Sequence, residues 1–147
     1  MIEIDSFANK IIISDAINKY PEECCGFLFG TEEAGKAIVS DALPVFNSAK
    51  GDKKRRFEIT SKDYMKAEHH AEKNNFSLLG IYHSHPDHPA IPSEHDRVAA
   101  QPFLSYLIIS VLNGAETELR SWKLNDEYQF VKEKLITKDL INNKITQ

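Results

Sequence analysis

The segment Leu78 to Asp96 reads LLGIYHSHPDHPAIPSEHD and contains, in order, an apolar run, a proline-rich turn and a helix start. Residues 78–82 are apolar and partly β-branched, which is typical of a buried strand. Side chains two residues apart on a strand share a face, so His83 and His85 are expected to present both imidazole rings on one side. Pro86 cannot donate to a sheet ladder, and we expect the strand to end there.

Ser93 and Asp96 follow a loop, residues 87–92, that contains two more prolines. Ser93 is expected to cap a helix, with Asp96 at the third position of a capping box. The loop is long enough to fold back and bring Asp96 close to the two histidines. The segment therefore predicts a His-His-Asp zinc site with water in the fourth position, the open coordination of a catalytic zinc. An ordinary helix cap without a ligand role is the alternative for Ser93 and Asp96.

Composition predicts an ordinary soluble protein. The chain has 147 residues, of which 41% are hydrophobic and 27% charged, and we expect residues 1–147 to form a single domain. No apolar run approaches the roughly 20 residues that cross a bilayer, and no signal-peptide pattern is present, so no membrane partner is expected. The net charge of −4 argues against nucleic acid as the main partner. The only cysteines, Cys24 and Cys25, are adjacent, which fits a reducing, cytoplasmic location.

Strands and helices alternate along the chain, which indicates an α/β fold with a mixed sheet. Helices are expected from Asp5 or Ser6 to about Lys19, with Phe7, Ile11 and Ala16 facing inward, from Thr60 or Ser61 to about Lys73, and after Ser93. From Lys132, the spacing of Leu135, Ile136, Leu140 and Ile141 predicts a short packing helix. Strands are expected at Ile2–Ile4, Cys24–Gly30, Ala37–Phe46 (broken by Pro44), Phe57–Ile59, Leu78–His85, Tyr106–Leu112, Leu119–Leu124 and Glu127–Val131.

Glu23 is the candidate general base outside the central segment. Hydrolysis at a metal needs a group that takes up a proton and returns it. Glu23 directly precedes the apolar run Cys24–Gly30, where a carboxylate would be partly desolvated. The alternative is that Glu23, like the adjacent Glu22, is a solvated residue at a helix end.

Together these residues resemble the JAMM/MPN+ zinc metalloprotease family. Its pattern is a Glu two residues before a small-residue–Gly pair, then H-x-H-P, then S-x-x-D. The matching pieces here are Glu23 with Cys25-Gly26, His83-Ser84-His85-Pro86, and Ser93 to Asp96. The phrases PEECCGFLFG, FEIT, SYLIISV and RSWKL resemble the short stand-alone bacterial branch, so the resemblance extends from about Ile2 to Val131.

The resemblance implies a curved mixed β-sheet flanked by helices, the MPN/JAMM fold, which is similar to the deaminase class. It implies that His83, His85 and Asp96 bind Zn²⁺ and that Glu23 activates the zinc-bound water and protonates the leaving amine. Ser93 would donate to the oxyanion, a role that competes with capping for one hydroxyl. The implied function is a zinc-dependent peptidase or isopeptidase. Its implied substrate is the amide bond at the C-terminal Gly-Gly tail of a ubiquitin-like sulfur-carrier protein.

Relatives with similar motifs suggest two alternative functions for this chain. One is a non-catalytic MPN-type scaffold, which this chain fits poorly because it retains every ligand of the motif. The other is a nucleic-acid-associated role like that of RadC-like relatives, against which the acidic net charge counts. The sequence leaves open the identity of the carrier, the group released, cleavage of ubiquitin itself and the oligomeric state.

Three further groups of residues have two interpretations each. The basic segment Lys50 to Arg56 is either a solvated loop tip or a rim that steers an acidic carrier protein. Cys24 and Cys25 cannot both reach one metal, because neighbouring strand residues face opposite ways, and Cys25 is expected to be a small core residue. The remaining histidines are expected on the surface, with a place at the site mouth as the alternative for the last two: His69, His70, His88 and His95.

Overall fold

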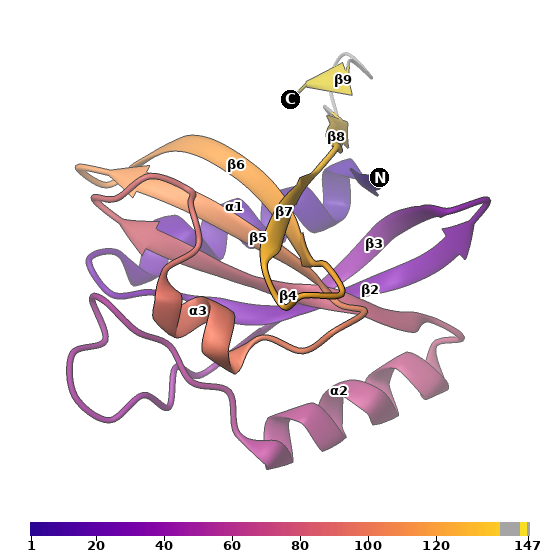
Figure 1. Ribbon diagram of the computed structural model, residues 1–147, viewed down its shortest axis with the longest axis horizontal. Coiled ribbons are helices and arrows are strands. Elements are labelled where there is room, and N and C mark those ends of the chain that lie inside the picture. The colour runs from indigo at the N-terminus through magenta and orange to yellow at the C-terminus, as the bar shows by residue number, and fades with distance from the viewer. Residues whose placement is uncertain (139–144, 147) are drawn as a thin grey trace.

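The computed structural model describes residues 1–138 and 145–146, whose strands form one curved mixed sheet in the order β7-β6-β5-β4-β2-β3-β1-β8-β9 (Figure 1). The strands are β1 (Ile2–Ile4), β2 (Cys25–Glu33), β3 (Lys36–Val45), β4 (Ser77–Pro86), β5 (Ser105–Leu112), β6 (Ala115–Leu124), β7 (Phe130–Glu133), β8 (Leu135–Lys138) and β9 (Ile145–Thr146). The helices are α1 (Ser6–Lys19), α2 (Ser61–Lys73) and α3 (Glu94–Ala99). This arrangement confirms the predicted fold class.

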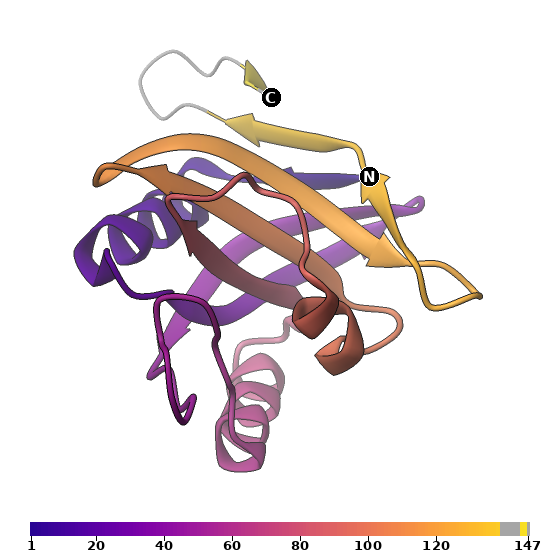
Figure 2. The same ribbon diagram turned by 60° about the vertical axis from the view of Figure 1, so that its left-hand side comes forward.

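The helices lie on opposite faces of the sheet, and each face has its own core. Helix α1 packs on one face, whereas α2 and α3 lie on the other (Figures 1 and 2). Leu28 of β2 packs with the α1 core, while its neighbours Phe27 and Phe29 pack with the α2 core. This alternation is the two-residue period of a strand buried on both sides.

Strand β4 lies in the middle of the sheet and positions the two motif histidines. It pairs antiparallel with β2, with Cys25 opposite His83, and parallel with β5, with Ile108 beside His83. The strand ends at Pro86, as predicted. Because His83 and His85 share the face of Ile81, a residue of the α2 core, both imidazoles lie on the side that α2 and α3 cover.

The three helices begin where the sequence predicted. Asp5, Thr60 and Ser93 each accept a hydrogen bond from a backbone N–H of the first turn, and the last two form capping boxes. Of the residues expected to face inward from α1, Ala16 is buried and Ile11 is half-buried against the same core, but the prediction for Phe7 was wrong. Phe7 is 61% exposed, and the buried stripe comprises Ala8, Ile12, Asp15 and Ala16.

Three strand and tail predictions were wrong. Pro44 does not break β3, because β1 pairs only with residues 37–39 and leaves that side of Pro44 without a neighbouring strand. Phe57–Ile59 is not a strand, since its neighbour is the loop at Asn47 and Ser48 rather than a sheet edge. Residues 130–138 form β7 and β8, which pair with the edges of β6 and β1, instead of starting a packing helix. Leu140 and Ile141 lie outside the described residues.

Among residues 1–138 and 145–146, no helix combines the length and apolar character that a membrane crossing requires.

Candidate active site

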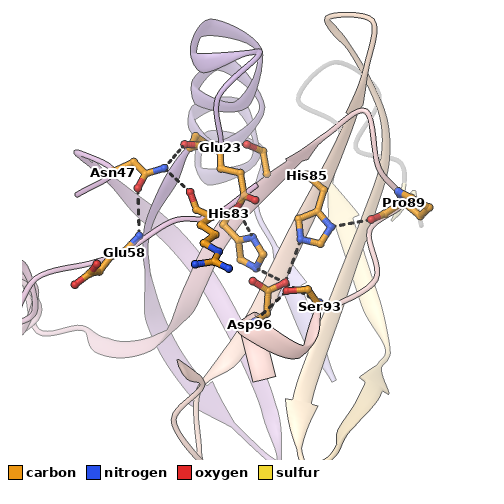
Figure 3. Close-up of polar contacts among 11 residues, drawn as sticks. Glu23, Asn47, Glu58, His83, His85, Pro89, Ser93 and Asp96 are labelled. Atoms are coloured by element: carbon orange, nitrogen blue, oxygen red, sulfur yellow. Dashed lines mark hydrogen bonds and ion pairs between the residues drawn. The ribbon is translucent and has the colours of Figure 1, made fainter. Parts of the chain in front are cut away.

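Two buried imidazoles from β4 form the centre of the candidate site (Figure 3). His83 is 1% and His85 7% exposed, and their ring centroids are 5.0 Å apart. Phe57 stacks on His83, with centroids 4.4 Å apart and the rings 24° from parallel. The segment that fails to form a strand therefore provides an apolar cover for this histidine.

Asp96 meets both histidines on their Nε2 sides. Its Oδ2 lies 3.1 Å from Nε2 of His85 and 3.9 Å from Nε2 of His83. Burial opposes ionisation of Asp96, but the nearby His83 and the hydrogen bonds from His85 and the Ser93 N–H outweigh it and hold the pKa of Asp96 well below its usual range. The loop does fold back, and the structure brings His83, His85 and Asp96 together.

The tautomer of His85 follows from its other nitrogen. Nδ1 lies 2.8 Å from the carbonyl oxygen of Pro89, which can only accept, so Nδ1 carries a proton. Nε2 of His85 then faces Asp96 in one of two protonation states. It is either unprotonated, so that its lone pair and the carboxylate can bind one cation together, or protonated as part of an imidazolium. Burial lowers the pKa of His85, but the contacts with Asp96 and Pro89 raise it above its usual value in the protein alone.

Glu23 lies on the opposite side of His83, between α1 and β2. It is 3% exposed, and its Oε1 is 3.5 Å from Nδ1 of His83. Among the described residues, both of these buried atoms lack a hydrogen-bond partner. Buried polar atoms are nearly always hydrogen-bonded, so an unpartnered pair beside a histidine cluster indicates a place for a further polar ligand. Glu23 is therefore not the solvated helix-end residue of the alternative interpretation.

The backbone of Glu23 is held by the loop that follows β3. Its N–H donates to the carbonyl of Lys53 at 2.8 Å, and its carbonyl accepts from Nδ2 of Asn47 at 3.1 Å. Asn47 also donates to the carbonyl of Arg56 and accepts from the backbone N–H groups of Ala49 and Glu58. Sequence reasoning missed Asn47 and Phe57, because neither has a fixed spacing to the motif and both act through a loop closure visible only in three dimensions.

Ser93 uses its hydroxyl oxygen, not its hydrogen, to cap α3. Its Oγ accepts from the Asp96 N–H at 3.0 Å, while its own N–H donates to Asp96 Oδ2 at 2.9 Å. The hydroxyl proton remains available, since a serine hydroxyl can accept and donate at once. Ser93 is exposed at the site rim, so capping and donation to a ligand are compatible.

A second grouping of possible metal ligands uses Glu23 in place of Asp96. One ligand atom from each of Glu23, His83 and His85 lies within 4.8 Å of the others. Glu23 approaches His83 at Nδ1, however, whereas Asp96 approaches the Nε2 atoms of both rings. The Asp96 grouping is the one that the sequence predicts, and its Oδ2 faces Nε2 of both rings.

The other sequence candidates lie outside the cluster. Cys25 is buried, and burial raises the pKa of its thiol to about 12, as expected of a core residue. His70 is not the exposed residue predicted, because it is half-buried and its Nε2 lies 2.8 Å from Asp41 Oδ2. His69, His88 and His95 are exposed, and His95 lines a cleft beside Asp96.

This cleft, of 390 Å³, adjoins the cluster on the α2 side. The basic residues Lys50 and Arg56 line it together with Phe57, Tyr64 and Tyr106. A larger cavity of 720 Å³ lies on the other face of the sheet, between α1 and strands β6 to β8, and contains none of the predicted site residues. Of these two cavities, the smaller cleft is the one lined by a predicted site residue, Asp96.

A mixed sheet carrying a buried cluster of two histidines and two carboxylates defines an α/β protein with a candidate metal centre. Residues 8–125 match the family described as prokaryotic homologs of the JAB domain, and the chain belongs to this family.

Similar named proteins and solved structures agree with this family assignment. A desampylase of Pyrococcus furiosus is 26% identical over 86% of this chain and 81% of its own length. A CysO-cysteine peptidase of Mycobacterium bovis is 28% identical over 78% of this chain and 77% of its own. A solution structure from Desulfitobacterium hafniense is 28% identical, with a TM-score of 0.83 over 97% of this chain and 96% of that one. A JAB1/MPN domain protein of Archaeoglobus fulgidus, 16% identical, shares the fold with a TM-score of 0.58 over 95% of this chain and 98% of that one.

Proposed function

We propose that this protein is a zinc-dependent peptidase or isopeptidase that hydrolyses the amide bond at the C-terminal Gly-Gly tail of a ubiquitin-like protein. The observation that carries the proposal is the convergence of two buried imidazoles between two buried carboxylates, Glu23 and Asp96, which have different hydrogen bonding. A desampylase and a CysO-cysteine peptidase among the relatives support a ubiquitin-like or sulfur-carrier substrate.

The donor set fits zinc. Imidazole nitrogen and carboxylate oxygen are ordinary zinc ligands, and three protein ligands leave one position open. The proton on Nδ1 of His85 leaves Nε2 as the metal-binding nitrogen, directed at Asp96. A cation between these atoms would remove the electrostatic conflict of a lone pair facing a carboxylate.

Glu23 would perform the proton transfers. A bound zinc ion supplies Lewis-acid chemistry, in that it polarises the scissile carbonyl and lowers the pKa of a water ligand to about 7. Glu23 accepts a proton from the attacking water as the new C–O bond forms. It then gives that proton to the amine nitrogen as the C–N bond breaks. Its unpartnered Oε1 leaves the carboxylate free for both transfers.

Ser93 would stabilise the oxyanion. Its hydroxyl proton is not used in capping α3, and the residue is exposed beside Asp96. One well-placed donor of this kind contributes about 3 kcal/mol to the stabilisation of the transition state. The cleft would admit an extended tail without large side chains. Its lining includes the basic residues Lys50 and Arg56, which would attract acidic groups of a carrier, beside the acidic Glu58.

Metal analysis and a cleavage assay test the proposal. Purified protein should contain about one zinc per chain. It should also release the C-terminal extension of a ubiquitin-like sulfur carrier directly after Gly-Gly, as measured by mass spectrometry. His83→Ala is the control and should lose both metal and cleavage. Wild-type protein without zinc would contradict the metal centre, whereas zinc-loaded protein that leaves linear and isopeptide-linked carriers intact would contradict the substrate.

A further inference from the structure

The loop between β4 and α3, residues 87–93, is fastened to strand β6 at a single residue, Ala90. Its N–H donates to Oε1 of Glu118 at 3.1 Å, and its carbonyl accepts from Nε1 of Trp122 at 3.1 Å. Ala90 is fully buried, so both of its backbone polar groups find their partners in side chains of β6. The sequence gives no indication of this contact, because Glu118 and Trp122 lie far along the chain from the motif.

The hydrogen bond between Ala90 and Glu118 orients the peptide group that His85 contacts. The carbonyl of Pro89 and the N–H of Ala90 belong to one peptide unit, which is planar, so the direction of one group fixes that of the other. At one edge of this planar unit the carbonyl accepts from Nδ1 of His85 at 2.8 Å, and at the opposite edge the N–H donates to Glu118. One rigid peptide therefore connects Glu118 to the ring of His85.

The next peptide unit is held in the same way. Trp122 fixes the carbonyl of Ala90, so two consecutive peptide planes are set by β6. Glu118 is itself oriented by Arg120, whose Nε donates to its other oxygen, Oε2, at 2.7 Å. Each oxygen of the Glu118 carboxylate thus has its own partner, which leaves Oε1 directed at Ala90.

We infer that Glu118 and Trp122 are positioning residues for His85. Glu118 acts on the Pro89–Ala90 peptide and Trp122 on the peptide that follows it, and together they keep the Pro89 carbonyl directed at Nδ1 and leave Nε2 available to a metal ion. The inference rests on the metal site of the proposed function. If this peptide turned, His85 would lose the acceptor for its Nδ1 proton and with it the preference for the metal-binding tautomer. Strand β6 thereby contributes to the metal affinity of the site through the backbone of the loop that follows β4.

The test is the zinc dissociation constant, measured by competition with a chelator of known affinity. Removal of an outer partner of a metal ligand weakens binding by about 10- to 100-fold. Because Glu118 and Trp122 act one bond further out, Glu118→Ala and Trp122→Phe should each weaken zinc binding by about tenfold. Glu118→Gln should weaken zinc binding less than Glu118→Ala, because its amide oxygen can still accept from Ala90 although its amide nitrogen can no longer accept from Arg120.

Ser121→Ala is the matched control. Ser121 is buried on the same strand but donates to Glu133 at 3.0 Å, so its loss should affect stability and leave zinc affinity unchanged. Unchanged affinity in folded Glu118→Ala and Trp122→Phe, or an equal loss in Ser121→Ala, would overturn the inference. If Trp122→Phe does not fold, the contrast between Glu118→Ala and Glu118→Gln decides. Wild-type protein that binds no zinc would overturn the proposed function as well.

Discussion

The two buried carboxylates of the site, Glu23 and Asp96, differ in how their oxygens are satisfied. Oδ2 of Asp96 accepts from the Ser93 N–H and lies next to both imidazoles, whereas Oε1 of Glu23 has no hydrogen-bond partner in the part of the chain that the structure describes. Asp96 is fixed by contacts with residues near it in sequence. The backbone of Glu23 is hydrogen-bonded to Lys53 and Asn47, and its Oε1 lies 3.5 Å from Nδ1 of His83. The side chain of Asp96 is thus held by a hydrogen bond to the backbone and by contacts with both imidazoles, whereas Oε1 of Glu23 approaches His83 without a hydrogen bond from any described residue.

The largest effects are expected when each of the two carboxylates is replaced by the corresponding amide, and the two substitutions should have different consequences. Glu23→Gln should retain zinc and lose activity by about 10³-fold, since a general base contributes 10² to 10⁴. Asp96→Asn should lose the zinc itself, because the anionic ligand is gone. Metal content and turnover are measured on the same samples. Loss of zinc in Glu23→Gln, with retention in Asp96→Asn, would reverse the two assignments.

A smaller effect is expected at Ser93, which caps α3 and is the proposed donor to the oxyanion. Ser93→Ala and Ser93→Gly should both lower turnover by about 100-fold, because both remove the hydroxyl donor. Their stabilities should differ, since Ala at an N-cap costs about 1 kcal/mol and Gly only a few tenths. Denaturant unfolding and kinetics on the two variants separate the roles. Turnover that follows stability instead of the hydroxyl would restrict Ser93 to capping.

Asn47 supports Glu23 and not Asp96, so its loss should affect only one side of the site. Asn47→Ala should lower the free energy of unfolding by about 1 to 3 kcal/mol, because it leaves buried backbone groups unpaired. It should also reduce turnover while zinc affinity stays close to that of the wild type.

Asn74→Ala provides a matched control for Asn47→Ala. Asn74 is exposed and donates to the carbonyl of His70 at the end of α2, far from Glu23 in the chain. Its loss should leave turnover unchanged. Weakened zinc binding in Asn47→Ala would indicate a general disturbance of the site.

The smallest effect concerns the cysteines directly after Glu23. Both are buried, and burial raises the pKa of Cys25 to about 12, so the thiol stays neutral and unreactive at pH 8. Iodoacetamide should modify the native protein slowly and the unfolded protein rapidly, as followed by mass spectrometry. Rapid modification of the native protein would mean that the start of β2 is open to solvent, contrary to the burial of Glu23.

Local sequence patterns predicted the parts of the site that depend on neighbouring residues. The shared face of His83 and His85 follows from the two-residue period of a strand, and the contact between Ser93 and Asp96 follows from helix capping. The same kind of reasoning was wrong for the segments at Phe57 and Leu135. Whether each of these segments forms a strand depends on whether it lies beside a sheet edge in the folded chain. A short β-prone run becomes a strand only beside a free edge, and the edges of β1 and β6 were available only to residues 130–138.

The sequence by itself determined the class of fold, the residue types of the candidate site and the spacing that allows a histidine pair and an aspartate to meet, because these depend on short-range backbone geometry. The tertiary structure alone decided that Glu23 lies 3.5 Å from His83 with an oxygen left unpartnered, and that Asn47 and the Pro89–Ala90 peptide hold the site from two sides. These contacts join residues distant in the chain through backbone groups. A backbone carbonyl carries no residue identity, so no pattern of residue types can indicate which carbonyl a side chain will meet.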